Sequence, residues 1–471
     1  MSKHLAIIGG GPAGYVAASY AAAEGARVTL IDPNPLGGTC LYRGCIPTKT
    51  LVEVCNLLIK MRHAESYGLS LTGTVEANWP AMRAKAGQVI DLLNKGINGL
   101  MADRKVTHIQ GRGRIVDGRH VEVAGQGVIA ADSVLICTGS SPILPESFNV
   151  NKARIVTSDE LLLWESLPKS LLIVGDGVVA CEYAFIMNAL GVKVSLVAMS
   201  ERPLPFIDSD IATIVHREMR KRGIEFLNKC QVERLENMLD GVSAIADGKT
   251  VASAERALVA IGRRPNIDGL GLEEAGVAIG KRNEIITDGM MRTNVDGLYA
   301  VGDVNARLAL AHAASAQARL AVNHALGSDP EPLDEWAIPW AVFTMPEIGS
   351  VGLSEQLAIE KGHVVNVGRF DMRGLGKAQA MSELTGMAKV VADRVSGRLL
   401  GVHIIGAHAS DMVHEAAVLI RQGATVHAIT QTVHAHPTLS EAILEAAEDT
   451  FGQAVHKPLK HKKVQHDVAL S

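Results

Sequence analysis

Two stretches of the chain share one pattern of hydrophobic and polar positions. Each begins with a short apolar run, 5–8 in the first stretch and 171–174 in the second, and each run leads directly into a glycine-rich turn. Such uninterrupted apolar runs are typical of parallel strands that are buried on both faces. After the first turn, residues 15–24 are rich in alanine and predict a helix, and residues 28–32 predict a second strand. The pattern therefore predicts the order strand, turn, helix, strand in an α/β fold.

The first turn carries Gly9, Gly11 and Gly14, which have the spacing Gly-x-Gly-x-x-Gly. Between a strand and a helix, and followed by a strand that ends in Asp32, this spacing is the dinucleotide-binding fingerprint. The glycines let a pyrophosphate approach the backbone at the helix N-terminus, and Asp32 can hydrogen-bond a ribose. A simple tight turn is the alternative, and the complete context favours the dinucleotide site.

The second turn, residues 175–177, belongs to a unit of the same kind, with Ala180 in place of the third glycine. Two such units in one chain predict two dinucleotides. In an NAD site the next strand ends in an acid, but the strand 192–199 has Ala198 in that position. An NADP site would carry arginine nearby, and Arg202 is the nearest cation. We expect NAD because no arginine cluster is present, and NADP stays open.

Cys40 and Cys45 lie in a further distinctive segment, residues 37–49. Pro47 fits an early helical position, because its missing N–H would be unpaired there in any case. Cys45 therefore lies near a helix N-terminus, where the helix dipole stabilises a thiolate and lowers the thiol pKa. Cys40 can be reached through Gly44, which predicts a redox disulfide. A chance pair of buried cysteines is the alternative, and the flanking residues argue against it.

The amino-acid composition mainly excludes classes of protein. The 471 residues are 47% hydrophobic and 20% charged with a formal net charge of −4, which suits a chain of about three domains. This balance gives no sign of nucleic-acid or membrane attraction, and no apolar run of about 18 residues predicts a transmembrane helix. Strand residues begin at Leu5, which leaves no room for a targeting segment. We expect a cytoplasmic protein without a metal, in which the other four cysteines are small core residues.

The segment 37–49 resembles the active-site signature of the class I pyridine nucleotide–disulfide oxidoreductases, with Tyr42 and Arg43 where that family usually has Asn and Val. Further motifs extend the resemblance over almost the whole chain: residues 138–142, 262–266, 293–304 and 434–441. The last of them is nearly the form found in lipoamide dehydrogenases. The resemblance implies two Rossmann-like domains, which bind FAD and NAD, and an α+β C-terminal dimerisation domain.

The resemblance and the breaks in the pattern, such as Pro142 and Pro145, together predict the domain boundaries. The expected parts are an FAD-binding domain at 1–146, an NAD(P)-binding domain at 147–270, a second FAD or central segment at 271–336, a dimerisation domain at 337–455 and a basic tail at 456–471. The tail combines lysines and histidines without an apolar period, so we expect a solvated end.

The resemblance also implies which residues form the site. The expected catalytic residues are Cys40, Cys45, Lys49, Glu182, His436 and Glu441. The expected cofactor-binding residues are Gly9, Gly11, Pro12, Ala13, Gly14, Asp32, Lys49, Thr138, Gly139, Ser140, Gly175, Gly177, Glu182, Gly262, Asp303 and Ala311. Cys45 would lie nearer the flavin, and Cys40 would exchange with the substrate. Lys49 and Glu182 would pair beneath the flavin.

Proton transfer would fall to His436, because thiol–disulfide exchange near neutral pH needs an acid–base group of this kind. Glu441 would orient its ring, as in other His–carboxylate pairs. His434 is the alternative base. Arg43 leaves three readings open: it could lower a thiol pKa, meet an acidic substrate or partner, or face solvent.

The implied activity is the oxidation of protein-bound dihydrolipoyl groups with reduction of NAD+. The enzyme would be a homodimer in which each base serves the other subunit, and its partner would be a lipoyl-bearing protein or a 2-oxo acid dehydrogenase-type complex. An NADPH-dependent reductase of another disulfide and a non-catalytic flavin-bound partner subunit are the alternatives.

Overall fold

The computed structural model describes residues 2–458, and the chain divides into two compact units. The first unit comprises the described residues up to Pro205, together with Val215–Glu335 and Phe343–Met345. The second comprises Phe206–Ile214, Trp336–Val342 and the described residues from Pro346 onward. Helix α7 (Ser209–Lys221) begins in the second unit and ends in the first.

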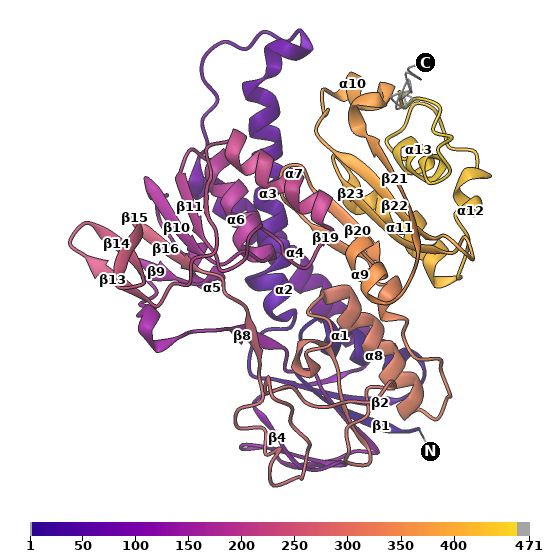
Figure 1. Ribbon diagram of the computed structural model, residues 1–471. Coiled ribbons are helices and arrows are strands. Elements are labelled where there is room, and N and C mark those ends of the chain that lie inside the picture. Colours follow the sequence, from indigo (N-terminus) through magenta and orange to yellow (C-terminus); the bar gives the residue numbers. More distant parts are fainter. Residues whose placement is uncertain (1, 459–471) are drawn as a thin grey trace, which may run out of the picture. The chain divides into compact units, whose positions relative to one another are not determined.

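A parallel sheet with the strand order β18-β7-β1-β2-β3 surrounds the first glycine-rich turn. Its strands are β1 (His4–Ile8), β2 (Arg27–Asp32), β3 (Thr107–Gln110), β7 (Ser133–Ile136) and β18 (Leu298–Ala300). Leu5 and Ile7 pack into one hydrophobic core and Ala6 and Ile8 into another, because successive side chains of a strand point to opposite faces. Helices α1 (Pro12–Ala23) and α8 (Ala311–Ala325) lie side by side over the first core (Figure 1).

A second parallel sheet, with the order β12-β11-β10-β16-β9, surrounds the second turn. Its strands are β9 (Ile155–Val156), β10 (Ser170–Val174), β11 (Lys193–Val197), β12 (Glu225–Leu227) and β16 (Arg256–Val259). Helix α6 (Val178–Ala189) follows the turn and is almost wholly buried. The two sheets confirm the predicted α/β architecture with two strand–turn–helix–strand units.

The cysteine segment forms two helices, α2 (Gly38–Tyr42) and α3 (Cys45–Arg62). Helix α3 packs along the long helix α4 (Trp79–Asp103), and both stand out in Figure 1. Helix α3 begins at Cys45, and a separate 3₁₀ turn, η1 (Ala64–Tyr67), follows it.

The remaining elements of the first unit are small. They are the antiparallel sheet β4 (Gly113–Asp117), β5 (His120–Val123) and β6 (Gly127–Ala130), the antiparallel sheet β13 (Arg234–Met238), β14 (Gly241–Ala246) and β15 (Lys249–Ala254), the pair β8 (Ser140–Pro142) and β17 (Arg263–Pro265), helix α5 (Ser158–Leu161), and the 3₁₀ turns η2 (Glu146–Phe148) and η3 (Gly302–Asn305).

The second unit is built on one antiparallel sheet with the order β19-β20-β23-β22-β21. Its elements are β19 (Trp340–Val342), β20 (Ile348–Gly352), β21 (Val365–Asp371), β22 (Met387–Asp393), β23 (Leu399–Ile405), α9 (Glu355–Glu360), α10 (Gly376–Met381), α11 (Ala409–Arg421), α12 (His427–Thr430), α13 (Glu441–Asp449) and η5 (Met372–Gly374); the turn η4 (Glu335–Ala337) leads into it. Helix α11 packs on β20 and β23, and α13 packs on β21 and β22, so both cover the same hydrophobic core. This is the expected α+β part of the chain.

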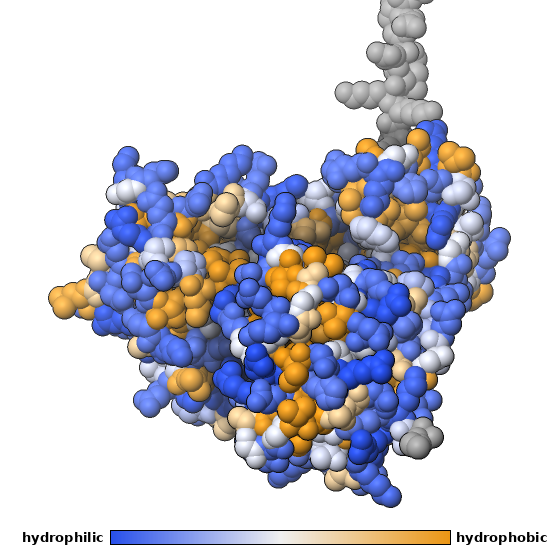
Figure 2. All heavy atoms as spheres, turned by 90° about the horizontal axis from the view of Figure 1, so that it is seen from below, coloured by the Kyte–Doolittle hydropathy of each residue, from blue (hydrophilic) through white to orange (hydrophobic). Residues whose placement is uncertain are grey.

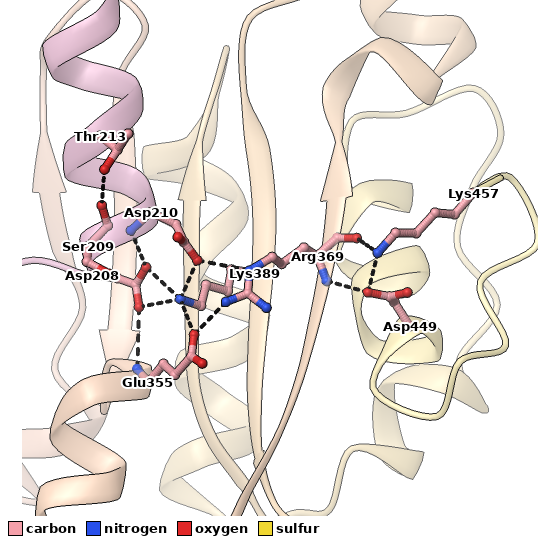
Figure 3. A network of polar contacts seen from close by, with 9 residues as sticks. All are labelled: Asp208, Ser209, Asp210, Thr213, Glu355, Arg369, Lys389, Asp449 and Lys457. Atoms are coloured by element: carbon pink, nitrogen blue, oxygen red, sulfur yellow. Dashed lines mark hydrogen bonds and ion pairs between the residues drawn. The ribbon is translucent and has the colours of Figure 1, made fainter. Parts of the chain in front are cut away.

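A buried cluster of charges, centred on Lys389 of β22, lies inside the second unit (Figure 3). The Lys389 side chain is 0% exposed, and its Nζ lies 2.9 Å from a carboxylate oxygen of Asp208, 2.6 Å from Asp210 and 2.7 Å from Glu355. Arg369 of β21 also contacts Asp210 and Glu355. The cluster attaches the segment 206–214 to a sheet that lies much later in the sequence.

The first residues of the predicted solvated tail have ion-pair partners, while the His456 side chain stays 70% exposed. The ring of His456 lies 2.6 Å from Glu445, and Lys457 Nζ contacts Asp449, so α13 holds both residues. Residues 459–471 of that predicted tail lie outside the described part of the chain.

Two features of the molecule bear on membrane insertion, its surface and its helices. On the face in Figure 2, hydrophobic residues form separate patches between hydrophilic ones. Within residues 2–458, no helix has the length and apolar character needed to cross a membrane.

Candidate active site

Cys40 and Cys45 lie on two consecutive helices, a short one and a long one, on either side of Gly44. Cys40 belongs to α2, and Cys45 is the first residue of α3. The Thr48 hydroxyl donates to the Gly44 carbonyl oxygen (2.7 Å), which fixes the first turn of α3 against the joint. A Cβ atom added at Gly44 would lie 3.1 Å from the carbonyl oxygen of Thr39, so this close approach favours glycine.

The two thiols differ strongly in acidity. The hydrogen bond that Cys45 accepts from Cys40 lowers the pKa of Cys45 to about 7; burial opposes this shift, and the Lys49 ammonium supports it. The same hydrogen bond, together with burial, raises the pKa of Cys40. Above about pH 7 the pair therefore holds a thiolate on Cys45 and a proton on Cys40. An unequal pair of this kind suits thiol–disulfide exchange, because the more acidic thiol is the better leaving group.

This inequality predicts a titration. In the reduced protein, the ultraviolet absorbance of thiolate should appear with a midpoint near the pKa of about 7 of Cys45. A protein with Cys45→Ser should lack this step, because burial still raises the pKa of Cys40 after its partner is lost, and burial raises the pKa of the neighbouring Cys55 to about 12. A step of equal size in the Cys45→Ser protein would assign the thiolate to another cysteine.

Lys49, one turn after Cys45, pairs with Glu182 of α6. Its Nζ lies 2.9 Å from both carboxylate oxygens, and the Glu182 side chain is only 4% exposed. Glu182 Oε1 also accepts the backbone N–H of Phe343 (2.9 Å), and the Phe343 ring lies 4.7 Å from the ammonium. The second hydrogen bond fixes the carboxylate, so this pair holds its geometry better than an exposed ion pair does. The structure thus brings together the two residues that we expected to pair.

The predicted residue Asp303 lies where three segments meet around Ser140. The Ser140 hydroxyl donates to Asp303 Oδ2 (2.6 Å) and accepts a hydrogen bond from Arg263 Nε (2.8 Å). Arg263 also donates to the Ser140 carbonyl oxygen (2.7 Å). This arrangement fixes a carboxylate at the edge of the first parallel sheet, where it can accept hydrogen bonds from sugar-like hydroxyls.

Asn266 fixes the neighbouring turn. Its carbonyl oxygen accepts the Thr138 hydroxyl (2.7 Å), and its side-chain amide donates to the Thr138 carbonyl oxygen (2.9 Å). Sequence reasoning named Gly262 of the run 262–266 and missed Arg263 and Asn266, although the Gly-Arg-x-Pro-Asn order in that run was the available signal.

A buried amide holds the turn η3, which contains Asp303. Gln317 of α8 is 1% exposed, and its Oε1 accepts the N–H of Gly302 (2.8 Å) and the side-chain amide of Asn305 (3.0 Å). Sequence reasoning gave Gln317 no role, because a single polar residue in an Ala-rich helix has no periodic signal. In the structure it is a positioning residue for the Asp303 turn.

The first glycine-rich turn leaves room for a ligand at the N-terminus of α1. A Cβ atom added at Gly11 would meet no atom closer than Gly38 Cα at 3.8 Å, whereas one added at Gly14 would overlap the carbonyl oxygen of Gly9. Gly11 is therefore open for a phosphate, and Gly14 allows the helix to approach the strand closely.

Asp32 lies at the end of β2, beside this turn. Its Oδ2 accepts the N–H of Gly10 (2.5 Å), and its Oδ1 accepts the N–H of Asn34 (2.7 Å). A fixed carboxylate next to an open helix N-terminus fits the ribose and the pyrophosphate of a dinucleotide such as FAD.

The other predicted cofactor residues also lie at turns that follow parallel strands. Pro12 and Ala13 open α1, Gly139 follows β7, Gly175 and Gly177 join β10 to α6, Gly262 follows β16, and Ala311 is the first residue of α8. At Gly177 an added Cβ atom would meet nothing within 4 Å among the described atoms, so the second turn is open as well. This fits a second dinucleotide.

In the second unit, the structure distinguishes the two candidate bases. His436 is exposed (76%), and its Nδ1 lies 2.9 Å from Glu441 Oε1. Glu441 also accepts the Thr438 N–H; burial raises the pKa of this carboxyl, and these two hydrogen bonds hold it below its usual value. His434, by contrast, is 5% exposed, and both of its ring nitrogens have partners, Glu415 Oε1 at 3.1 Å and a backbone carbonyl. The geometry therefore favours His436.

Arg43 pairs with a carboxylate outside the cysteine segment. Its Nη1 lies 3.4 Å from Asp159 Oδ2, and the side chain is 56% exposed. The cation that lowers the pKa of Cys45 is Lys49. The interpretation that Arg43 tunes the thiols therefore has no support in the structure, and the half-exposed side chain agrees with the solvent-facing reading.

Two glycine-rich strand–turn–helix units and a dithiol of unequal acidity define the class of nucleotide-dependent disulfide oxidoreductases. Comparison with known proteins agrees. Residues 3–318 match the family described as pyridine nucleotide-disulphide oxidoreductase, and residues 338–447 match its dimerisation domain. The chain belongs to the pyridine nucleotide-disulphide oxidoreductase family, as its motifs had predicted.

Individual relatives align over nearly their whole length. A dihydrolipoyl dehydrogenase of Bacillus subtilis is 38% identical over 470 residues, which cover 96% of this chain and 98% of the relative. One of Chlamydia muridarum is 37% identical over 460 residues, with 97% and 98% covered. Among solved structures, LpdA from Mycobacterium tuberculosis has a TM-score of 0.89 and 30% identity over 95% of this chain and 99% of that one.

Proposed function

We propose that this protein is a dihydrolipoyl dehydrogenase: it oxidises protein-bound dihydrolipoyl groups and reduces NAD+. The observation that carries the proposal is the Cys40–Cys45 pair, in which one thiol has a pKa of about 7 and the other keeps its proton. The near full-length similarity to dihydrolipoyl dehydrogenases supports the choice of substrate over another disulfide.

The unequal pair sets the order of the thiol steps. In the oxidised enzyme, a dihydrolipoyl thiolate attacks Cys40 Sγ of the disulfide, and Cys45 leaves as a thiolate because it has the lower pKa. The second lipoyl thiol then attacks the first lipoyl sulfur in the mixed disulfide. This closes the lipoyl ring and releases Cys40. The substrate is oxidised to the cyclic disulfide, the enzyme pair is reduced, and Cys40 takes up one proton.

Lys49 and Glu182 belong beside the bound flavin in this proposal, and the turns after β1 and β10 hold FAD and NAD+ respectively. A bound FAD would supply the two-electron chemistry that links the dithiol to NAD+. The part-buried Lys49 ammonium keeps a positive charge one helical turn from Cys45, where it stabilises the thiolate; Glu182 fixes the ammonium but itself acts against the thiolate.

His436 takes the proton of the attacking lipoyl thiol through Nε2, while Glu441 holds Nδ1. We propose that the protein is a homodimer in which this pair serves the dithiol of the other subunit; the match to a dimerisation domain supports a dimer. The lipoyl group would be carried by a protein of a 2-oxo acid dehydrogenase-type complex, in the cytoplasm.

Replacing His436 with glutamine should lower kcat/KM for dihydrolipoamide by about 10²-fold near neutral pH, the scale of general-base catalysis. The loss should shrink at high pH, because the substrate thiol then ionises without help. Steady-state rates as a function of pH measure this. His434→Gln, whose ring is already occupied by Glu415, is the matched variant. A larger loss of activity with an altered pH profile in His434→Gln would reverse the assignment.

The activity itself is tested on the purified, FAD-loaded protein. Dihydrolipoamide and NAD+ should give NADH at a steady rate. NADPH-driven reduction of glutathione disulfide without dihydrolipoamide oxidation would favour the alternative reductase. The absence of both activities in a protein that retains FAD would favour a non-catalytic subunit.

A further inference from the structure

Strand pairing gives a residue-by-residue correspondence between the two glycine-rich units. In the first unit, Ile8 of β1 lies opposite Ile31 of β2. In the second, Val174 of β10 lies opposite Val197 of β11. Ile8, Val174 and Val197 are the last residues of their strands, and Ile31 is the last but one of β2. Because the two pairs are in the same register, the positions that follow them can be compared directly.

The two glycine-rich units carry their acidic residue at different positions, one at the strand end and the other in the turn. In the first unit, Asp32 follows Ile31, and its Oδ2 accepts the N–H of Gly10 in the turn. In the second unit, Ala198 stands at the position of Asp32, and Asp176 stands at the position of Gly10. Asp176 Oδ2 in turn accepts the backbone N–H of Ser200, just beyond the end of β11, at 3.3 Å. A carboxylate therefore lies between the turn and the strand end in both units, but it comes from opposite sides.

Steric room explains why each unit carries one acid. A Cβ atom added at Gly10 would lie 3.3 Å from Asp32 Oδ2 and closer still to the Leu36 side chain, so a side chain in this turn conflicts with an acid on the second strand. In the second unit Ala198 is small and buried (3% exposed). The apparent loss of the acid from the strand end is thus matched by an acid in the turn.

We propose that Asp176 is the residue that binds the adenosine ribose of NAD+ and discriminates against NADP+. This inference rests on the proposed nicotinamide site in the second glycine-rich unit, residues 171–199, which lies within the first compact unit. A carboxylate accepts hydrogen bonds from the ribose hydroxyls and repels a 2′-phosphate. Lys229, a cation near this loop, is already paired with Glu201 at 3.2 Å, so it does not offset the negative charge of Asp176.

Direct binding tests the proposal without reliance on turnover. Isothermal titration calorimetry of the oxidised, FAD-loaded enzyme with NAD+ and NADP+ gives both dissociation constants. Asp176→Asn should raise the Kd for NAD+ by about tenfold or more, the scale of a charge-assisted hydrogen bond, and should reduce the preference for NAD+ over NADP+. A Kd for NAD+ and a preference that are both unchanged would overturn the assignment.

Two further variants sharpen the result. Asp176→Gly with Ala198→Asp recreates the arrangement of the first unit and should restore NAD+ binding, which a merely structural role of Asp176 would not require. Glu201→Gln combined with Lys229→Gln removes the neighbouring exposed ion pair as a whole and should leave both constants unchanged. A loss of NAD+ binding in this double variant but not in Asp176→Asn would give the role to the Glu201–Lys229 pair. If the wild-type enzyme bound neither nucleotide, the proposed function would fail instead.

Discussion

Replacing Cys45 with serine is expected to abolish the oxidation of dihydrolipoamide by NAD+, a loss on the order of 10⁴-fold or more, as follows removal of a covalent nucleophile. Serine cannot form the disulfide with Cys40, so the substrate thiolate has no disulfide to attack. Cys40→Ser should lose turnover to the same extent, because the mixed disulfide forms at that sulfur. Steady-state formation of NADH measures both losses.

The control is a third cysteine of the same helix. Cys55 lies on α3, and its Sγ is buried 3.8 Å from the Ile186 carbonyl oxygen. Cys55→Ser should keep nearly wild-type turnover. Cys40→Ala should raise the pKa of Cys45, because the hydrogen bond from Cys40 is the largest cause of its lowering. Substantial turnover in either active-site variant would contradict the proposed exchange reaction.

The sequence was sufficient where chemistry depends on local order. Strand, glycine turn, helix and acid are consecutive in the chain, and so are Cys40, Gly44 and Cys45, so local rules placed both the dinucleotide units and a thiol at a helix start. The pairing of Lys49 with Glu182 joins distant residues, and family resemblance rather than spacing suggested it. The roles of these residues in catalysis remain predictions.

Long-range contacts were beyond the reach of such rules. Gln317 accepts a hydrogen bond from the turn at Gly302, and Arg263 donates one to Ser140, which belongs to another motif. Neither residue interrupts a periodic pattern in the sequence. Asp176 could be recognised only after the strand registers showed which positions correspond. The segment 206–214 is joined to the second unit by Lys389, which lies about 180 residues away, as the sequence separations of 181 and 179 show.

Lys389→Met should destabilise the second unit by about 3–5 kcal/mol, the cost of breaking a buried ion pair by removal of one partner. The ammonium is 0% exposed and contacts three carboxylates, those of Asp208, Asp210 and Glu355. Without it, Arg369 is left to balance these acids. Methionine fills a similar volume, so the expected loss is electrostatic. Hydrogen exchange of the β22 amides measures the free energy of opening in this unit.

An exposed ion pair provides the matched control. Lys229 Nζ lies 3.2 Å from Glu201 Oε1, and the two side chains are 66% and 70% exposed. Lys229→Met should therefore change the overall stability by only about 0–1 kcal/mol. Combining Lys389→Met with Asp208→Asn should recover part of the loss, because one uncompensated buried charge is removed with its partner. Equal effects of Lys389→Met and Lys229→Met on the overall stability would contradict a special role for burial.

The pH dependence separates charge from packing. Burial raises the pKa of Asp210, but its hydrogen bonds and charge interactions with Lys389 and Arg369 outweigh burial and hold this pKa below its ordinary value. A lowered folded-state pKa stabilises the fold fully above the unfolded pKa of about 4, and this contribution is lost only as the pH falls through the lowered value. In Lys389→Met the main cause of the lowering is gone, so the carboxyls protonate at higher pH and their repulsion is relieved earlier. The stability gap between wild type and variant should therefore narrow as the pH falls from 7 towards about 4. A gap that stays constant over this range would mean that lost packing, rather than unpaired charge, causes the destabilisation.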